Sequence, residues 1–220
     1  MLPLKWIERR GYVDEEGNKR FADWLDGLDA VAAAKATIAP ARMEKGNFSN
    51  VKGVGAGVFE YKIEFGPGYR IYFGKDGERL VILIGGGTKR RQNRTSGQPR
   101  NAGPITSDVK KRRTIMPLTH DFKKTVRARA QRDPKFRQSL LREAVECILN
   151  GDLDIGKAVL RDYVNATVGF QDLEKRTHIP AKSLMRMLGP KGSPSVANFS
   201  SILIALQKTE GVVFELSLKR

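Results

Sequence analysis

Cysteine, histidine and long apolar runs are scarce in this 220-residue chain. The single cysteine, Cys147, excludes an intramolecular disulfide, and the presence of only two histidines, His120 and His178, argues against a zinc site. No apolar run approaches the roughly 18 residues of a membrane-spanning helix, and no charged start followed by an apolar core marks a signal peptide. These absences predict a soluble, cytoplasmic protein with no metal, no cofactor and no membrane association.

Positive charge is what the chain has in excess. Its 40 Lys and Arg residues outnumber 24 Asp and Glu residues, for a formal net charge of +16. An excess of this size favours a polyanionic partner, with nucleic acid as the first candidate and an anionic membrane surface as the competing one. The length allows one large domain or two small ones, and the uneven composition favours two.

The first part of the sequence begins with a helical pattern. Phe21, Trp24, Leu25 and Leu28 have helical spacing, an alanine-rich helix follows, and Pro40 is expected to end or kink it. The glycine and asparagine content of residues 44–57 indicates a loop.

The period then changes to two. Apolar and polar residues alternate in VFEYKIEF and YRIYF, so each of these strands has one wet face. RLVILIGGG is a continuous apolar run, as expected of a central strand. The first half is therefore expected to be α+β, with a small antiparallel sheet and two helices.

Composition changes again at residue 88. Residues 88–113 contain nine Lys or Arg against one acid, and they have almost nothing to bury, which indicates a linker. After it, Asp133 as N-cap and Pro134 at the first helical position begin a helix that ends before Gly151. Four further short amphipathic helices and a terminal strand are expected in DIGKAVLRDYVNATVG, FQDLEKRTH, IPAKSLMRMLG, SVANFSSILIALQKTEG and VVFELSL, in that order.

Two stretches resemble bacterial toxin-antitoxin proteins. GNFSNVKGVGAGVFEYKIEFGPGYRIYF and LVILIGGGTKRRQ, preceded by FADWLDGLD, resemble the RelE/HigB-type toxins called addiction module killer proteins. The glycine-proline-glycine hairpin, the arginine two residues after it and the glycine-rich strand end carry this likeness. The run from ILNGDLDIGKAVL through GSPSVANFSSILIAL is similar to a HigA-like helix-turn-helix antitoxin, and Met116 stands where such an antitoxin would start.

The resemblance implies a fusion of the two proteins. We expect a RelE-like toxin domain at residues 1–92, a basic flexible linker at 93–115 and an all-α helix-turn-helix antitoxin domain at 116–220. For the first half, the resemblance implies ribosome-dependent cleavage of mRNA that uses basic and aromatic side chains in place of a histidine pair.

Cutting RNA through its own 2′-OH requires removal of that proton, stabilisation of charge on the phosphorane and assistance to the departing 5′-oxygen. Arg70 can bind phosphate through two hydrogen bonds, and Tyr72 can stack on a base. Lys62 or Lys52 can serve as a base or as an electrostatic clamp. Lys62, Arg70 and Tyr72 come from neighbouring strands of the predicted wet face, so they are candidates for one catalytic site.

An alternative interpretation treats these as ordinary solvated residues, with Arg70 paired to Glu60 or Glu64. The sequence also departs from the family, whose members usually carry arginine in place of Lys62 and a terminal helix in place of the basic tract. Two outcomes are therefore compatible with the sequence: the joined chain has a latent, metal-independent RNA-cleaving activity, or it has lost that activity. Lys89, Arg90 and Arg91 either contact ribosomal RNA or begin the linker.

In the second half, FQDLEKRTHIPAKSLMRML has the spacing of a scanning helix, a tight turn and a recognition helix. A generic helical hairpin is the alternative. The side expected to pack inward carries Leu173, Ile179, Leu184 and Leu188. The residues expected to meet base edges or phosphates are Lys182, Ser183, Arg186 and Lys191.

We expect three kinds of partner: operator DNA, ribosome-bound mRNA, and a toxin-antitoxin contact within or between chains of a homodimer. Two other functions are compatible with the sequence. One is a DNA-binding transcriptional repressor with a non-catalytic toxin half, suggested by the missing terminal helix. The other is an RNA-binding protein that does not cleave, suggested by the basic linker.

Overall fold

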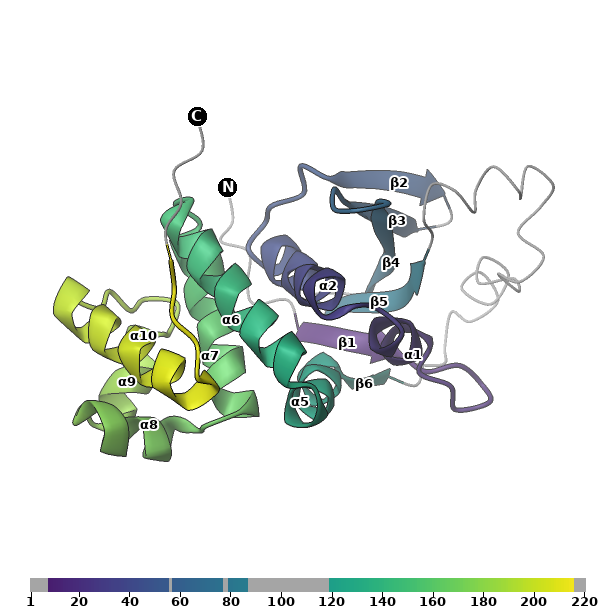
Figure 1. The fold of residues 1–220 in the computed structure, drawn as a ribbon. Helices are drawn as coiled ribbons and strands as arrows, with labels where there is room; N and C mark the ends of the chain where they lie inside the picture. Colours follow the sequence, from purple (N-terminus) through teal and green to yellow (C-terminus); the bar gives the residue numbers. More distant parts are fainter. Residues whose placement is uncertain (1–7, 56, 77–78, 87–118, 216–220) are drawn as a thin grey trace. The chain divides into compact units, whose positions relative to one another are not determined.

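The computed structural model describes residues 8–55, 57–76, 79–86 and 119–215, which fall into two compact units (Figure 1). The first unit is Met1–Thr125 and the second is Val126–Arg220. The predicted linker, residues 93–115, lies outside the described residues. The segment that follows the linker belongs to the first unit, so this unit extends further along the chain than the predicted toxin-like domain.

The described part of the first unit is built on a sheet with the strand order β2-β3-β4-β5-β1-β6. Strands β2 to β5 pair antiparallel with their neighbours, β1 joins parallel to β5, and β6 pairs antiparallel with β1. The central position of the apolar strand β5 is confirmed. The strands are β1 (Glu8–Tyr12), β2 (Val51–Gly55), β3 (Val58–Ile63), β4 (Tyr69–Asp76), β5 (Arg79–Gly86) and β6 (Thr119–Asp121).

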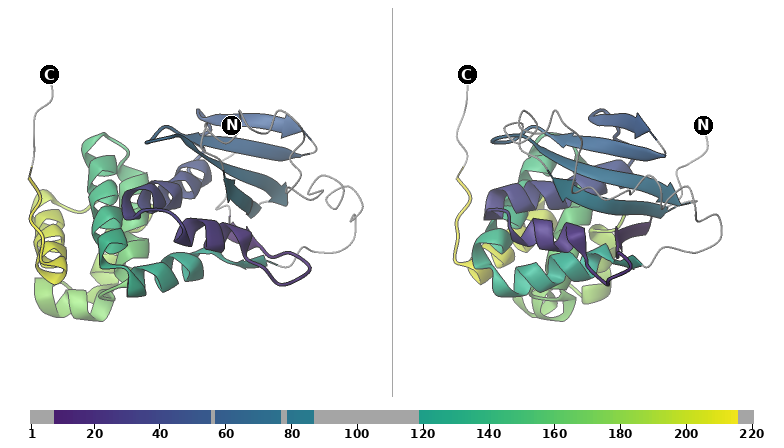
Figure 2. Two further views of the ribbon diagram at one scale, coloured as in Figure 1. Left: turned by 45° about the vertical axis from the view of Figure 1, so that its right-hand side comes forward. Right: turned by 90° about the vertical axis from the view of Figure 1, so that its right-hand side faces the viewer.

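Two helices, α1 (Arg20–Asp26) and α2 (Ala30–Glu44), lie on the same side of this sheet (Figure 2). Asp29 caps α2, since its carboxylate accepts a hydrogen bond of 2.9 Å from the N–H of Ala32. The core between helices and sheet contains Phe21, Leu25, Ile38, Met43, Tyr61, Ile71 and Phe73, all buried. The prediction of an α+β chain with a small sheet and two helices in its first half is confirmed.

The hairpin between β3 and β4 fixes which side chains reach each face. Tyr61 and Ile63 are buried while Lys62 is exposed, so the predicted two-residue period holds in the second half of β3. Gly66 and Gly68 have φ values of 52° and 79°, in the left-handed region that glycine adopts at no steric cost. The turn therefore depends on the two glycines around Pro67.

Three strands were not predicted from the sequence: β1, β2 and β6, the last of which follows the predicted linker. β1 precedes the helices, and β2 lies within the stretch expected to be loop. β1 has the sequence ERRGY and β2 has VKGVG, and neither alternates clearly between apolar and polar residues. Pairing with β5 and β3 outweighs this weak intrinsic preference, because strand formation depends strongly on the neighbours.

Two further expectations differ from the described structure. Pro40 was expected to end or kink its helix, and it does not end it, since α2 continues to Glu44. Tight burial of the alanine-rich helix offsets the lost hydrogen bond of an interior proline, a cost of about 3 kcal/mol. Residues 212–215, the described part of the predicted terminal strand, do not form a strand. The N–H of Phe214 instead donates to the Gln207 side chain at 2.6 Å.

The second unit is helical in its described part, as predicted. Asp133 caps α6, since its carboxylate accepts from the N–H of Phe136 at 3.0 Å, and Pro134 occupies the first helical position. Helix α5 begins in the first unit and runs into the second. The helices are α5 (Phe122–Arg132), α6 (Pro134–Leu149), α7 (Leu153–Ala166), α8 (Phe170–Thr177), α9 (Ala181–Met187) and α10 (Val196–Glu210).

A buried polar cluster ties the end of α10 to α6 and α7. The Glu210 carboxylate, whose side chain is 2% exposed, pairs with Arg137 Nε at 3.0 Å. The same carboxylate accepts a hydrogen bond of 2.6 Å from the Tyr163 hydroxyl. Burial, followed by this hydrogen bond, raises the pKa of Tyr163, so the phenol stays neutral and remains a donor.

Candidate functional site

The four residues predicted to be catalytic share one face of the sheet. Lys52 lies opposite Glu60, and Glu60 lies opposite Tyr72 on the next strand. Lys62 lies opposite Arg70 one row further along. Cross-strand partners point to the same side of a sheet, as do residues two apart, so this face is the one opposite the buried Tyr61 and Ile71.

Arg70 is held by an ion pair on that face. Its Nε lies 3.0 Å from Glu60 Oε1, and the two side chains are only 14% and 18% exposed. This contact is one of the two pairings in the alternative interpretation of the face as ordinary sheet surface. Arg70 meets a phosphate from this position only if the phosphate competes with Glu60 or binds the remaining guanidinium donors.

Tyr72 sits beside the same carboxylate. Burial, then a hydrogen bond with Glu60 and its negative charge, raises the pKa of Tyr72 to about 12, while the Arg70 charge opposes this shift. Tyr72 is therefore neutral near pH 7 and acts as a hydrogen-bond donor or a stacking surface, not as a base. Tyr72 and Tyr12 also pack against Val58, which is 9% exposed, so this face is less wet than the alternating pattern predicts.

Lys62 and Lys52 keep their ammonium groups near solvent. Lys62 Nζ lies 2.7 Å from Glu64 Oε1, and the side chains are 50% and 68% exposed. The hydrogen bond from Lys62 lowers the pKa of Glu64. An exposed pair of this kind contributes little stability and opens readily, so Lys62 remains available to an anion. Lys52 is exposed on β2, an edge strand of the described sheet.

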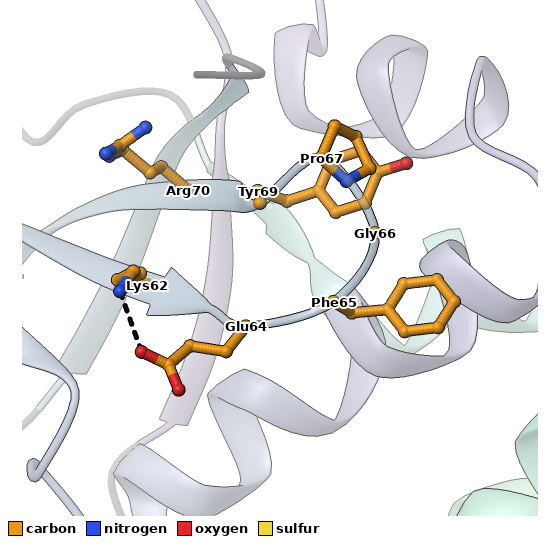
Figure 3. Close-up of a pocket in the computed structure, with 8 residues that line it drawn as sticks. Lys62, Glu64, Phe65, Gly66, Pro67, Tyr69 and Arg70 are labelled. Atoms are coloured by element: carbon orange, nitrogen blue, oxygen red, sulfur yellow. Dashed lines mark hydrogen bonds and ion pairs between the residues drawn. The ribbon is translucent and has the colours of Figure 1, made fainter.

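A pocket of about 290 Å³ opens at the hairpin next to Lys62 and Arg70. Figure 3 shows Lys62, on β3, joined to Glu64 just past the end of that strand, and Arg70 extending from the neighbouring strand. The volume is close to the lower end for ligand pockets, roughly 300 Å³, and therefore suits a small group. The pocket is lined by Lys62, Glu64, Phe65, Gly66, Pro67, Gly68, Tyr69 and Arg70.

The sequence did not indicate the role of Glu60. Sequence reasoning treated it only as a possible partner of Arg70, whereas the structure places it between Arg70, Tyr72 and the strand carrying Lys52. Lys89, Arg90 and Arg91, the predicted contacts to ribosomal RNA, lie outside the described residues.

The second candidate site is formed by α8, a three-residue turn and α9. His178 ends α8 in the left-handed conformation, with φ of 56°, and so begins the turn. Leu173, Leu184 and Leu188 are buried, and Ile179 is half-buried. This is the packing expected of a helix-turn-helix.

The predicted DNA contacts differ in exposure. Lys182 and Arg186 are exposed on α9, and Lys191 is exposed on the loop after it. Ser183 is half-buried, and its N–H donates to the carbonyl of Pro180 at 2.8 Å. Ser183 is therefore less available to DNA than the three cations.

Side chains outside α9 fix its two ends, and these were not predicted. Glu174 on α8 accepts a hydrogen bond of 3.1 Å from the N–H of Ala181, which satisfies one of the free donors at the start of α9. At the other end, Arg161 on α7 donates to the carbonyl of Met185 at 3.3 Å. Each contact joins two different helices, so the periodicity of a single helix does not indicate it.

The loop that carries Lys191 is fixed just as closely. Lys157 Nζ on α7 donates to the carbonyl of Gly192 at 2.7 Å and pairs with Asp154 at 2.9 Å. A Cβ added at Gly192 would lie 2.2 Å from the carbonyl oxygens of Arg186 and Met187. Only glycine lets the loop approach α9 this closely, and the loop is held in one position relative to that helix.

Two classes of site are not found among the residues that the structure describes. No group of three or more His, Cys, Asp or Glu side chains is arranged to hold a metal ion. No described helix is long and apolar enough to cross a membrane.

The described residues thus define an α+β unit with a basic and aromatic sheet face, followed by a helical unit that contains a helix-turn-helix. An uncharacterized protein of Haemophilus influenzae is 40% identical to this chain over 75 residues, which is 34% of this chain and 76% of the relative. The chain belongs to the same family as that protein. No family model matches the chain, and no solved structure matches it.

Proposed function

We propose that the chain is a cytoplasmic type II toxin-antitoxin fusion, in which the second half binds operator DNA and neutralises the first. The observation that carries this proposal is the helix-turn-helix, whose second helix is held at both ends while Lys182 and Arg186 stay exposed. In such motifs the second helix enters the major groove. A net charge of +16 supports an anionic partner.

DNA binding is tested with the full chain and DNA from upstream of its own gene. We expect a dimer on an inverted repeat, with half-sites about one helical turn apart, and an affinity that falls steeply with salt. Arg186→Ala should reduce discrimination between operator and random DNA by about 1 to 3 kcal/mol if Arg186 reads a base. An unchanged ratio of the two affinities would show that α9 is not the recognition helix.

For the first half we propose a metal-independent mRNA endonuclease that acts on ribosome-bound message. Lys52, Lys62, Arg70 and Tyr72 on one sheet face support this, because together they offer cations for a phosphate and a ring for a base. Since Tyr72 is a neutral donor, it would assist the departing 5′-oxygen or stack on a base. Lys62 or Lys52 would serve as the base or the clamp.

The test for cleavage is primer extension on mRNA in a translating extract. The chain is cut at a specific protease site inserted after Arg132, so that the first fragment keeps β6 and Phe122, and it is compared with the uncut chain. We expect cleavage after separation of the two fragments, and Arg70→Ala should abolish it while the circular dichroism spectrum stays unchanged. Equal cleavage by the Arg70→Ala protein would remove Arg70 from the site.

The second candidate function is a DNA-binding repressor whose first half does not cleave RNA. The ion pair between Arg70 and Glu60 favours it, because both side chains are largely withdrawn from solvent and are paired with each other. In this case no fragment cleaves RNA, while operator binding and its dependence on Arg186 remain.

A further inference from the structure

The edge of the first unit's sheet is completed by residues that follow the predicted linker. We call Thr119–Thr125 the docking segment. Its first part is β6, which pairs antiparallel with β1 through Tyr12 opposite Thr119, Gly11 opposite His120 and Arg10 opposite Asp121. Without β6, the backbone N–H and C=O groups on one side of β1 would have no partner strand within the described sheet.

The second part of the docking segment is a buried aromatic side chain. Phe122 is fully buried, and its ring centroid lies 5.5 Å from that of Phe21 on α1. The guanidinium carbon of Arg9, on β1, lies 5.7 Å from the centre of the Phe122 ring. Contacts with an aromatic ring and with a cation at these distances are favourable beyond simple burial.

The docking segment also contains the transition from strand β6 to helix α5. The Asp121 carboxylate accepts a hydrogen bond of 2.9 Å from the N–H of Lys123, which stabilises the start of α5 directly after β6. Thr125, one turn into α5, is 9% exposed. A strand followed at once by a buried phenylalanine is a compact recognition element, in which main-chain hydrogen bonds and one side-chain anchor act together.

From these contacts we infer that β1, Phe21 and Arg9 form a docking site for a strand-plus-phenylalanine segment. Its occupant is the chain's own Thr119–Thr125. The second half is thereby attached to the first by a separable contact in addition to the peptide chain. This extends the proposed function by naming the contact through which the antitoxin-like half is held on the toxin-like half, but it depends on neither RNA cleavage nor DNA binding.

The direct test uses the full chain with a specific protease site inserted between Gly97 and Gln98. After cutting, the two fragments should elute together in gel filtration at micromolar concentration. An excess of the peptide PLTHDFKKTV, residues 117–126, should release the second fragment. The same peptide with Phe122→Ala should not. Spontaneous separation, no release by the native peptide, or equal release by both peptides would each overturn the inference.

A pair of variants in the cut chain gives an independent measurement. Phe122→Ala should weaken association of the two fragments about thirtyfold, as expected when a buried aromatic anchor is lost. Lys124→Ala changes an exposed residue of the same segment and should leave association within about twofold. If both variants associate as tightly as the unmodified chain, Phe122 is not the anchor. RNA cleavage and operator binding are measured separately, so a failed toxin-antitoxin proposal leaves this result unaffected.

Discussion

Glu60 determines much of what the sheet face can do. It pairs with Arg70 at 3.0 Å, and its hydrogen bond and charge help to raise the pKa of Tyr72. A substrate phosphate must therefore compete with a carboxylate for Arg70. The sequence placed Glu60 and Glu64 on the same face as Arg70, but it could not tell which would pair with it, since both lie within reach of a long side chain.

Replacing Glu60 should change the titration of Tyr72. The pKa of about 12 lies above the unfolded value of about 10, so neutral Tyr72 stabilises the fold below pH 10, and this contribution is lost as pH rises toward 12. Glu60→Gln should move the pKa of Tyr72 down toward 10 but not fully, because burial remains. NMR titration of ¹³C-labelled tyrosines checks this, with Tyr72→Phe to assign the signal. An unchanged pKa would mean that burial alone raises it.

Arg137 and Arg142 lie on the same helix and provide a matched pair for stability. Arg137→Met leaves the Glu210 carboxylate, 2% exposed, without its cation, and should lower the free energy of unfolding by about 3 kcal/mol. Arg142→Met breaks a pair whose side chains are 72% and 41% exposed, and should cost less than about 1 kcal/mol. Urea unfolding followed by circular dichroism measures both. Equal effects would contradict a structural role for the buried cluster.

Among the elements, helices were easier to predict than strands. α6 to α10 have apolar residues at helical spacing, and α6 has a proline and a cap at the expected places, so local chemistry is sufficient. β1, β2 and β6 are short and contain glycine or charge. β2 forms a hairpin with the next strand, β3, whereas β1 and β6 pair with strands far away in the sequence. The identity of β1 and β6 as strands therefore depends on tertiary pairing, which no local window contains.

The same contrast applies to the helix-turn-helix. The inward leucines and the outward Lys182 and Arg186 follow from period and spacing. The contacts of Lys157, Arg161 and Glu174 that position α9 and its loop come from other helices and have no sequence pattern. DNA recognition by α9 would depend on them, because a bidentate contact to a base tolerates little displacement.

Lys157→Met should weaken operator binding without unfolding the chain. The variant loses the hydrogen bond that fixes the Gly192 carbonyl, so Lys191 is no longer held in place, and we expect about a tenfold loss of affinity. If Lys191 binds phosphate, the slope of log affinity against log salt should also fall by about one. Fluorescence anisotropy over a salt series measures both. Lys208→Met, an exposed residue of α10, is the control. Equal effects of the two variants would contradict a positioning role for Lys157.

For the whole molecule, the division into compact units does not coincide with the division suggested by composition. The basic tract separates residues 1–92 from the helical half, yet the first unit reaches Thr125. Composition reports which residues have apolar surface to bury, and THDF contains too little to be recognised. This segment contributes one edge strand, β6, and one buried phenylalanine, Phe122. Both depend on contacts with β1 and α1, which lie far away in the sequence.

A fragment that ends at Gln92 should therefore be less stable than one that ends at Arg132, where α5 is complete. The shorter fragment lacks β6 and Phe122, and loss of a buried phenylalanine alone costs about 3 to 5 kcal/mol. It should also aggregate through the unpaired edge of β1. Urea unfolding and light scattering compare the two fragments. Equal stability and equal solubility would show that residues 119–132 are dispensable for the first unit.

The pairing of Arg10 with Asp121 also governs the order of events during synthesis. A ribosome completes β1 long before it reaches β6, so the sheet cannot close while only the first half of the chain has emerged. Loop closure over such a separation is entropically costly and slow. The sheet of the nascent first half therefore lacks β6 until translation has entered the second half. Each finished sheet is thus made together with the beginning of its proposed neutralising partner.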